Sequence, residues 1–336
     1  MDTTNSSRTV REPYWDIVRG LLVFLVVLGH TIQFVRFDGF GNEFFSYPLF
    51  KGIYLFHMPL FALVSGYFSV GSIARRGARQ IIRAAVHLLT PCLTVVLIAN
   101  ARVIYHYFKT ASNLDLSFTS PFFLLWFLIC IFECSVFMCI LMSRTSWWWR
   151  SFWCVFPIVL AVYTSVIPLA CNFAFLYPFY LVGAYLYSKG WKGESIWGFF
   201  LSIVVFTGVF IIFKPSYYVY CSPLNCYHHD WESWLTASIR FAGGLSGSLC
   251  FLYLVRWLRF LGKVKVIQDM GKFSLAIYVL QGIFIEYVWI IHFQTVRMNL
   301  PLCMVGAVLL LFLLYGCTLL INKSRVLKFL FLGETK

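Results

Sequence analysis

The sequence contains a series of apolar runs, each about as long as a helix that crosses a lipid bilayer. We read ten predicted spans, at approximately 16–35, 52–70, 84–104, 121–142, 152–168, 172–188, 196–213, 235–255, 273–293 and 301–322. A span needs about 20 apolar residues, and the backbone inside lipid must satisfy its own hydrogen bonds, which favours helices. Only 12% of the 336 residues are charged, too few to cover a water-facing surface. The sequence therefore predicts an all-α, polytopic membrane helix bundle of about ten transmembrane helices.

The distribution of positive charge predicts the orientation of this bundle. The net charge is +14, which in a soluble protein would suggest nucleic acid as a partner. Here Lys and Arg gather in alternate loops between the apolar runs, as the positive-inside rule requires. We expect a multi-pass protein of the cell inner membrane with both termini in the cytoplasm and no nucleic-acid partner. The expected segments are a tail over 1–13, a membrane domain over 14–322 and a second tail over 323–336.

The cysteines do not predict a metal site. Eleven are present, most of them inside apolar runs, and no pair has metal-ligand spacing. Cys221 and Cys226 share one polar loop. They pair if that loop faces an oxidising compartment, and otherwise remain free thiols.

Polar side chains inside the predicted spans mark candidate functional positions, because they are costly to place in lipid. They are His30, His57, Glu133, Glu286, Arg102, Arg240 and Gln281. A structural role remains open for several of them. Each histidine could donate to a neighbouring backbone carbonyl, and each glutamate could be neutral and hydrogen-bonded within the bundle.

Arg19 and His30 form the most informative pair. Eleven residues advance an α-helix by about three turns plus roughly 20°, so both side chains share one helix face. Their axial separation is about 16 Å, roughly half the thickness of the hydrocarbon layer. One ligand could therefore touch both side chains. Asp16 lies three residues before Arg19, so we expect an ion pair that fixes the arginine.

Two further groups extend this candidate site. The second predicted span runs antiparallel to the first and places His57 at a depth similar to that of His30, which suggests a proton-handling centre. Arg75, Arg76 and Arg79 stand beside a glycine turn on the predicted cytoplasmic side. They are explained most simply as a topology signal, as Arg19 is when taken alone. Three guanidinium groups in five residues would also bind phosphates.

Several motifs resemble those of the acyltransferase-3 family, membrane-bound enzymes that O-acylate bacterial surface polysaccharides. The family mark is an Arg, ten residues and then a His, which Arg19 and His30 match. A second motif, at 56–61 and 65–68, is fairly specific together with the first, and weaker similarities follow at 75–91, 126–128, 179–183, 271–274 and 277–278. The resemblance covers residues 14 to 322. One departure is Gln281, which stands where many members carry a histidine and cannot titrate.

The resemblance implies a membrane O-acetyltransferase. Acetyl-CoA would be a co-substrate and not a permanently bound cofactor, with its phosphates at Arg19, Arg75, Arg76 and Arg79. His30 would act either as a general base on the acceptor hydroxyl or as the acceptor of a covalent acetyl group. His57 would orient His30 or stabilise the oxyanion. The acceptor would be a sugar of a lipid-linked or surface polysaccharide.

Two other classes of protein fit the same composition. A secondary transporter or flippase of a glycan-related solute also carries polar residues inside its spans. Repeated halves, which are typical of many transporters, are absent from the sequence. A non-catalytic partner subunit or sensor would leave the Arg–His spacing as a coincidence.

Overall fold

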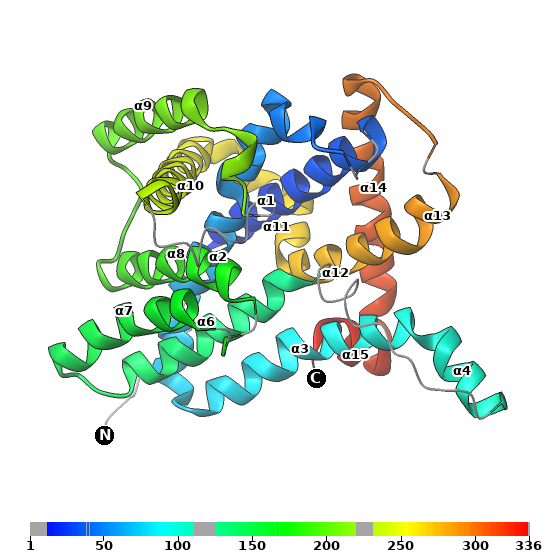
Figure 1. Cartoon of the computed structure of the whole chain (residues 1–336), viewed down its shortest axis with the longest axis horizontal. Helices are drawn as coiled ribbons and strands as arrows, with labels where there is room; N and C mark the ends of the chain where they lie inside the picture. The colour runs from blue at the N-terminus through cyan, green and yellow to red at the C-terminus, as the bar shows by residue number, and fades with distance from the viewer. Residues whose placement is uncertain are drawn as a thin grey trace.

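The computed structural model describes residues 12–37, 39, 41–110, 125–164, 166–167, 169–219, 231–293 and 295–334, without the side chains of Arg102, His106, Thr110, Arg259, Glu286 and Ile291. All regular structure in these ranges is helical (Figure 1). The α-helices are α1 Pro13–Thr31, α2 Pro48–Arg76, α3 Arg79–Ala99, α4 Ala101–Thr110, α6 Trp126–Met142, α7 Trp147–Tyr163, α8 Ala170–Ser188, α9 Ile196–Ile212, α10 Trp231–Trp257, α11 Lys265–Lys272, α12 Ser274–Phe284, α13 Ile290–His292, α14 Leu300–Ile321 and α15 Arg325–Leu332. Two π-helical segments, η1 Ile32–Arg36 and η6 Ile285–Trp289, continue α1 and α12. Short 3₁₀ turns occupy Glu43–Ser46, Pro215–Tyr217 and Arg259–Lys263.

Several of these helices are long and apolar enough to cross a membrane. Five of the described helical segments meet that requirement, or six if the bent pair of α11 and α12 with η6 is one span. The helices α6 and α9 are apolar but shorter. The prediction of an all-helical membrane protein is confirmed. The number of ten spans and the cytoplasmic position of the termini stay predictions.

Some predicted spans end or bend where side chains compete with the helical backbone. The predicted span at 84–104 is divided at Asn100, whose side-chain amide donates to the Val96 carbonyl oxygen at 2.8 Å. Such local bonds offer the backbone an alternative to continuing the helix.

The predicted tail 323–336 contains α15, which packs against α3. The Thr94 hydroxyl of α3 donates to the Leu330 carbonyl oxygen at 2.7 Å.

Two pairs of helices pack with their backbones in direct contact. On α2 and α8, β-carbons at Gly66 and Gly183 would overlap the carbonyl oxygens of Tyr180 and Leu63. On α1 and α11, the same holds for Gly20 and Gly271, which face the carbonyl oxygens of Ile267 and Asp16. Small residues permit this close approach, which is a main source of helix association within lipid. The α1–α11 contact lies beside Arg19 and so helps to position the candidate site.

Candidate functional site

Arg19 is held by two groups of its own helix and by an aromatic ring of α2. Its Nη2 atom lies 2.6 Å from Oδ1 of Asp16, which confirms the expected ion pair. Its Nε donates to the Trp15 carbonyl oxygen at 3.4 Å, and its guanidinium lies 5.3 Å from the centre of the Phe68 ring. The Arg19 side chain remains 25% exposed. The cation is thus oriented by the protein and still accessible to a ligand.

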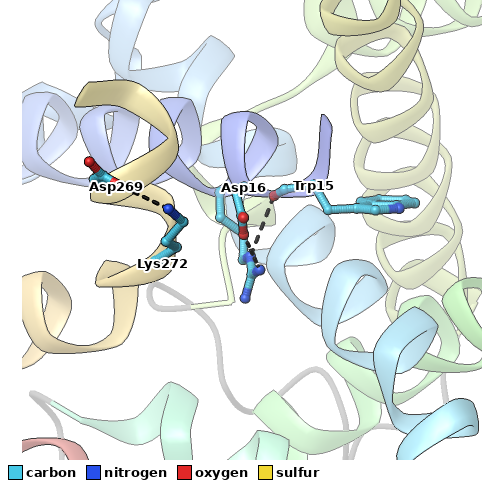
Figure 2. Close-up of polar contacts among 5 residues, drawn as sticks. Trp15, Asp16, Asp269 and Lys272 are labelled. Carbon is cyan, nitrogen blue, oxygen red and sulfur yellow. Dashed lines mark hydrogen bonds and ion pairs between the residues drawn. The ribbon is translucent and has the colours of Figure 1, made fainter. Parts of the chain in front are cut away.

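The carboxylate that orients Arg19 is itself buried, in a residue whose backbone packs against α11. Asp16 is 2% exposed, and its backbone carbonyl lies against Gly271. Figure 2 shows Asp16 and Trp15 beside the ion pair of Asp269 and Lys272 on α11, which measures 2.7 Å. A buried carboxylate is stable only when it is paired. The packing of α11 therefore supports the Asp16–Arg19 pair.

The other predicted phosphate ligands lie at the same end of α2 as the Arg19 contact. Arg75 lies seven residues beyond Phe68, about 10 Å further along the helix axis. Arg75 and Arg79 are exposed, whereas Arg76 is half-buried and its Nη1 lies 3.5 Å from the side-chain oxygen of Gln80. The three arginines form a cationic rim at this end of the bundle.

Arg19 lines a cavity of about 250 Å³ between α1, α2, α3, α6 and α12. Most of its wall is apolar, and its other polar groups are Ser65, His87, Ser274 and Tyr278. We call it the Arg19 cavity. Sequence reasoning did not single out His87, although a histidine inside an apolar run was the signal available.

His30 forms a hydrogen bond with Gln281 of α12. The distance between Nδ1 of His30 and Nε2 of Gln281 is 2.7 Å. The same Nε2 lies 3.4 Å from the carbonyl oxygen of Val26. Gln281 is 1% exposed. The position that departs from the family pattern therefore contacts the candidate catalytic histidine directly.

The Val26 carbonyl decides which end of the Gln281 amide faces His30. If the amide were turned over, its oxygen would oppose another oxygen where no hydrogen is available. The nitrogen therefore faces both Val26 and His30 and donates to Nδ1. In a neutral imidazole one nitrogen accepts and the other carries the hydrogen. His30 is accordingly assigned as the tautomer with its hydrogen on Nε2.

His30 lines a second cavity, of about 390 Å³, which we call the His30 cavity. Both π-helical segments contribute to it, with Phe34 and Val35 from η1 and Ile285 and Trp289 from η6. The indole of Trp289 donates to the Phe34 carbonyl oxygen at 3.2 Å and ties the two segments together. Such π-bulges occur frequently at functional sites.

The structure separates the surroundings of Arg19 and His30 more than the sequence predicts. Helix α1 is unbroken from Pro13 to Thr31, so the predicted three-turn spacing holds. The two side chains nevertheless line different cavities. Helix α12 contributes to both walls, with Tyr278 in the Arg19 cavity and Gln281 in the His30 cavity. A ligand that touches both side chains would have to extend between the two cavities, which α1 and α12 both border.

His57 lies near His30, but its resolved hydrogen bond is to its own helix. Its Nδ1 lies 2.9 Å from the Ile53 carbonyl oxygen, the structural arrangement that the sequence left open. The Tyr54 ring lies 4.6 Å from the His57 ring and 6.3 Å from the His30 ring, centre to centre. The hydrogen-bond partner of His30 is Gln281. An orienting or oxyanion role for His57 stays a prediction.

The remaining candidates lie apart from the two cavities or outside the described residues. Both carboxylate oxygens of buried Glu133 lack a partner within the described part of the chain. Arg240 binds the carbonyl oxygens of Tyr217 and Tyr218. The predictions for the Arg102 and Glu286 side chains and for Cys221 and Cys226 fall outside the described residues. The described ranges contain no cluster of His, Cys, Asp or Glu that could hold a metal ion.

Comparison with known proteins finds two relatives and a matching family. The chain is 29% identical to nodulation protein NolL of Mesorhizobium japonicum over 85% of its own length and 80% of that protein. It is 32% identical to nodulation protein NolL of Sinorhizobium fredii, over 52% of the chain and 48% of that protein. No solved structure matches it significantly. Residues 12–321 match the acyltransferase domain that defines the acyltransferase-3 family. The chain therefore belongs to the acyltransferase-3 family and is a membrane-bound acyltransferase.

Proposed function

We propose that this protein is a membrane-embedded O-acetyltransferase that uses cytoplasmic acetyl-CoA to acetylate a hydroxyl of a lipid-linked or surface polysaccharide sugar. The observation that carries the proposal is the His30–Gln281 hydrogen bond of 2.7 Å at the wall of an apolar cavity. It gives an intramembrane imidazole a fixed orientation in a chain of the acyltransferase-3 family. Catalytic groups need this kind of fixed geometry.

The donor is expected to bind first at the cationic end of α1 and α2. Arg19 is exposed enough to contact a phosphate, and Arg75, Arg76 and Arg79 add charge at the same end. Guanidinium groups bind phosphate oxygens through paired hydrogen bonds. The thin pantetheine arm would then run along α12 from the Arg19 cavity toward His30. The Arg19 cavity has a mostly apolar wall, which suits such an arm.

At His30, the assigned tautomer offers an N–H group to the thioester carbonyl oxygen. The hydroxyl oxygen of the acceptor bonds to the carbonyl carbon, the carbon–sulfur bond breaks, and the hydroxyl proton ends on the sulfur of released CoA. A donor aimed at the developing oxyanion lowers the barrier for this step. General-base or nucleophilic action through Nε2 requires the other tautomer and a turned Gln281 amide.

A single assay tests the proposed reaction. Purified protein with acetyl-CoA is expected to release free CoA only when a glycan acceptor is present, and the glycan is expected to gain the mass of an acetyl group. The deletion strain is expected to lose that acetyl increment from its surface glycans. Movement of a glycan-related solute across vesicles without CoA release would support the transporter alternative instead.

Replacing Arg19 by alanine is expected to raise the KM for acetyl-CoA. Losing a charge-assisted hydrogen bond costs about 1.5–3 kcal/mol, which corresponds to roughly 10- to 100-fold in KM. Arg19→Lys should recover part of this loss, because an ammonium group keeps the charge but not the planar fork. The matched control is Arg150→Ala, which removes an exposed arginine of α7. An equal KM in Arg19→Ala and Arg150→Ala would leave Arg19 as a topology anchor.

A further inference from the structure

The His30 cavity contains a buried hydrogen-bond acceptor that the protein leaves unused. Oε1 of Gln281 has no hydrogen-bond partner among the described residues, although Gln281 is only 1% exposed. The amide nitrogen of the same side chain already contacts Val26 and His30, and turning the amide over would break the contact with Val26 and require the other His30 tautomer. Buried carbonyl oxygens are nearly always paired. A ligand that brings a hydrogen-bond donor to this position would complete the pairing.

The chemistry of that missing partner distinguishes the two substrates of an acyl transfer. A thioester carries oxygen and sulfur acceptors at its reacting end and no hydrogen to donate. A hydroxyl group both donates and accepts. The free oxygen of Gln281 therefore suits the hydroxyl-bearing acceptor, whereas the N–H of His30 suits the thioester carbonyl.

The remaining wall of the cavity is almost entirely apolar. Apart from His30, Thr31 and Gln281, it consists of apolar side chains and one glycine, and these include Phe34, Phe284 and Trp289. A sugar ring lying against this part of the wall, away from Gln281, would lose its water there without gaining partners, which is unfavourable. A hydrocarbon chain fits this wall, because apolar pockets with few polar groups bind mainly apolar ligands.

The cavity is bordered on one side by α14, whose outer face is apolar. Leu309 and Leu313 line the cavity and are 64% and 55% exposed. In a predicted span, exposed leucines of this kind face lipid. Gly306, on the same border, has no atom within 4 Å of the place where a β-carbon would stand. Space therefore remains beside α14 for a chain to enter from the bilayer.

We propose that the His30 cavity binds the acceptor as a hydroxyl-bearing amphiphile, with a hydroxyl donating to Oε1 of Gln281 and its hydrocarbon chain lying along η1, η6 and α14. The role of this amphiphile as the acyl acceptor rests on the proposed acetyl transfer, whereas its binding site does not. The hydrocarbon chain enters the cavity from the lipid beside Gly306. Gln281 selects the hydroxyl, and the apolar wall selects the membrane-borne form of the substrate.

Photo-crosslinking tests the site without requiring turnover. The probe is an octyl glycoside with a diazirine at the end of its alkyl chain, added to purified protein without acetyl-CoA. Mass spectrometry is expected to find the label on cavity residues, chiefly Phe34, Trp289 and Leu310. The series Gly306→Ala, Gly306→Leu and Gly306→Phe should reduce labelling progressively. Gly316→Phe is the matched control, because Gly316 lies on the same helix and has equally open surroundings.

A second variant tests the role of the Gln281 oxygen. Gln281→Leu is expected to weaken binding of the glycoside probe about tenfold, as for one lost hydrogen bond. A diazirine alkane of equal length, which has no hydroxyl, should label this variant as well as the original protein. Equal loss of both probes would reduce Gln281 to a structural role and overturn its part in the proposal.

The outcomes separate this inference from the proposed function. Equal labelling of Gly306→Phe and Gly316→Phe, or label spread along all lipid-facing helices, would overturn the amphiphile site even if acetyl transfer occurs. Saturable labelling in the cavity with no CoA release from any acceptor would support the site and contradict the transfer reaction. A raised KM for the octyl glycoside in Gly306→Leu, with an unchanged KM for the same sugar without its chain, would support both.

Discussion

Replacing His30 by alanine is expected to abolish acyl transfer while leaving the protein level and membrane insertion unchanged. The variant removes the N–H group that faces the thioester carbonyl in the proposed complex. A positioned proton donor or acceptor contributes roughly 10²–10⁴-fold to a rate, so turnover should fall by at least about 100-fold. The KM for acetyl-CoA should change little, because Arg19 lies three helical turns away. CoA release by purified protein measures both quantities.

Two further variants make the His30 result specific. His57 lies near His30, but its resolved hydrogen bond is to the Ile53 carbonyl oxygen of its own helix. Comparing the turnover of His57→Ala with that of His30→Ala measures how much each histidine contributes to the reaction. His30→Gln keeps a polar side chain of similar reach without a ring. Full activity in His30→Ala would remove His30 from the chemistry and leave the family spacing without a catalytic role here.

Replacing Gly183 by valine is expected to cause a large loss of folded-state stability. A β-carbon there would overlap the Leu63 carbonyl oxygen, so α2 and α8 would have to separate. Overpacking of a fitted interface costs typically 1–3 kcal/mol and occasionally more. We expect a cost of about 3 kcal/mol or more, because the obstruction is backbone and cannot rotate away. The midpoint of unfolding in detergent measures the effect.

The control for Gly183 is another helical glycine with open surroundings. Gly208 lies on α9, and no atom would lie within 4 Å of its β-carbon. Gly208→Val should leave the unfolding midpoint nearly unchanged, because only a modest difference in helix propensity is involved. Equal midpoints for Gly183→Val and Gly208→Val would show that the backbone contact of α2 and α8 does not limit stability.

The composition of the sequence was enough to predict helices. It was not enough to predict how many of these helices cross the membrane. Long apolar runs must become helices in lipid, and the described structure is helical wherever it is regular. Local side-chain bonds and packing decided where helices end, as at Asn100, whose amide binds back to Val96. A window of hydrophobicity does not detect such a bond, so the predicted span at 84–104 has the length of α3 but lies five residues further along the chain than Arg79–Ala99.

Contacts of functional side chains within one helix could be predicted from the sequence, whereas contacts between distant helices could not. The Asp16–Arg19 pair was predictable because residues three apart are neighbours on any helix. The Gln281–His30 bond joins residues 251 positions apart and depends on how α12 packs against α1. In the sequence Gln281 was visible as a polar residue inside a predicted span and as a departure from the family pattern, but not as the partner of His30. His87 was visible only as a histidine in an apolar run.

The sequence by itself determined the membrane-helical class, the Arg19–His30 spacing and the family of this protein. Each of these depends on short-range order along the chain: the length of apolar runs, the pitch of one helix and a set of local motifs. Only the tertiary structure decided that Arg19 and His30 line different cavities, that Gln281 orients the imidazole, and that α14 borders the His30 cavity. Those arrangements depend on the packing of helices distant in sequence, and their backbone contacts at glycine are not encoded in any single segment.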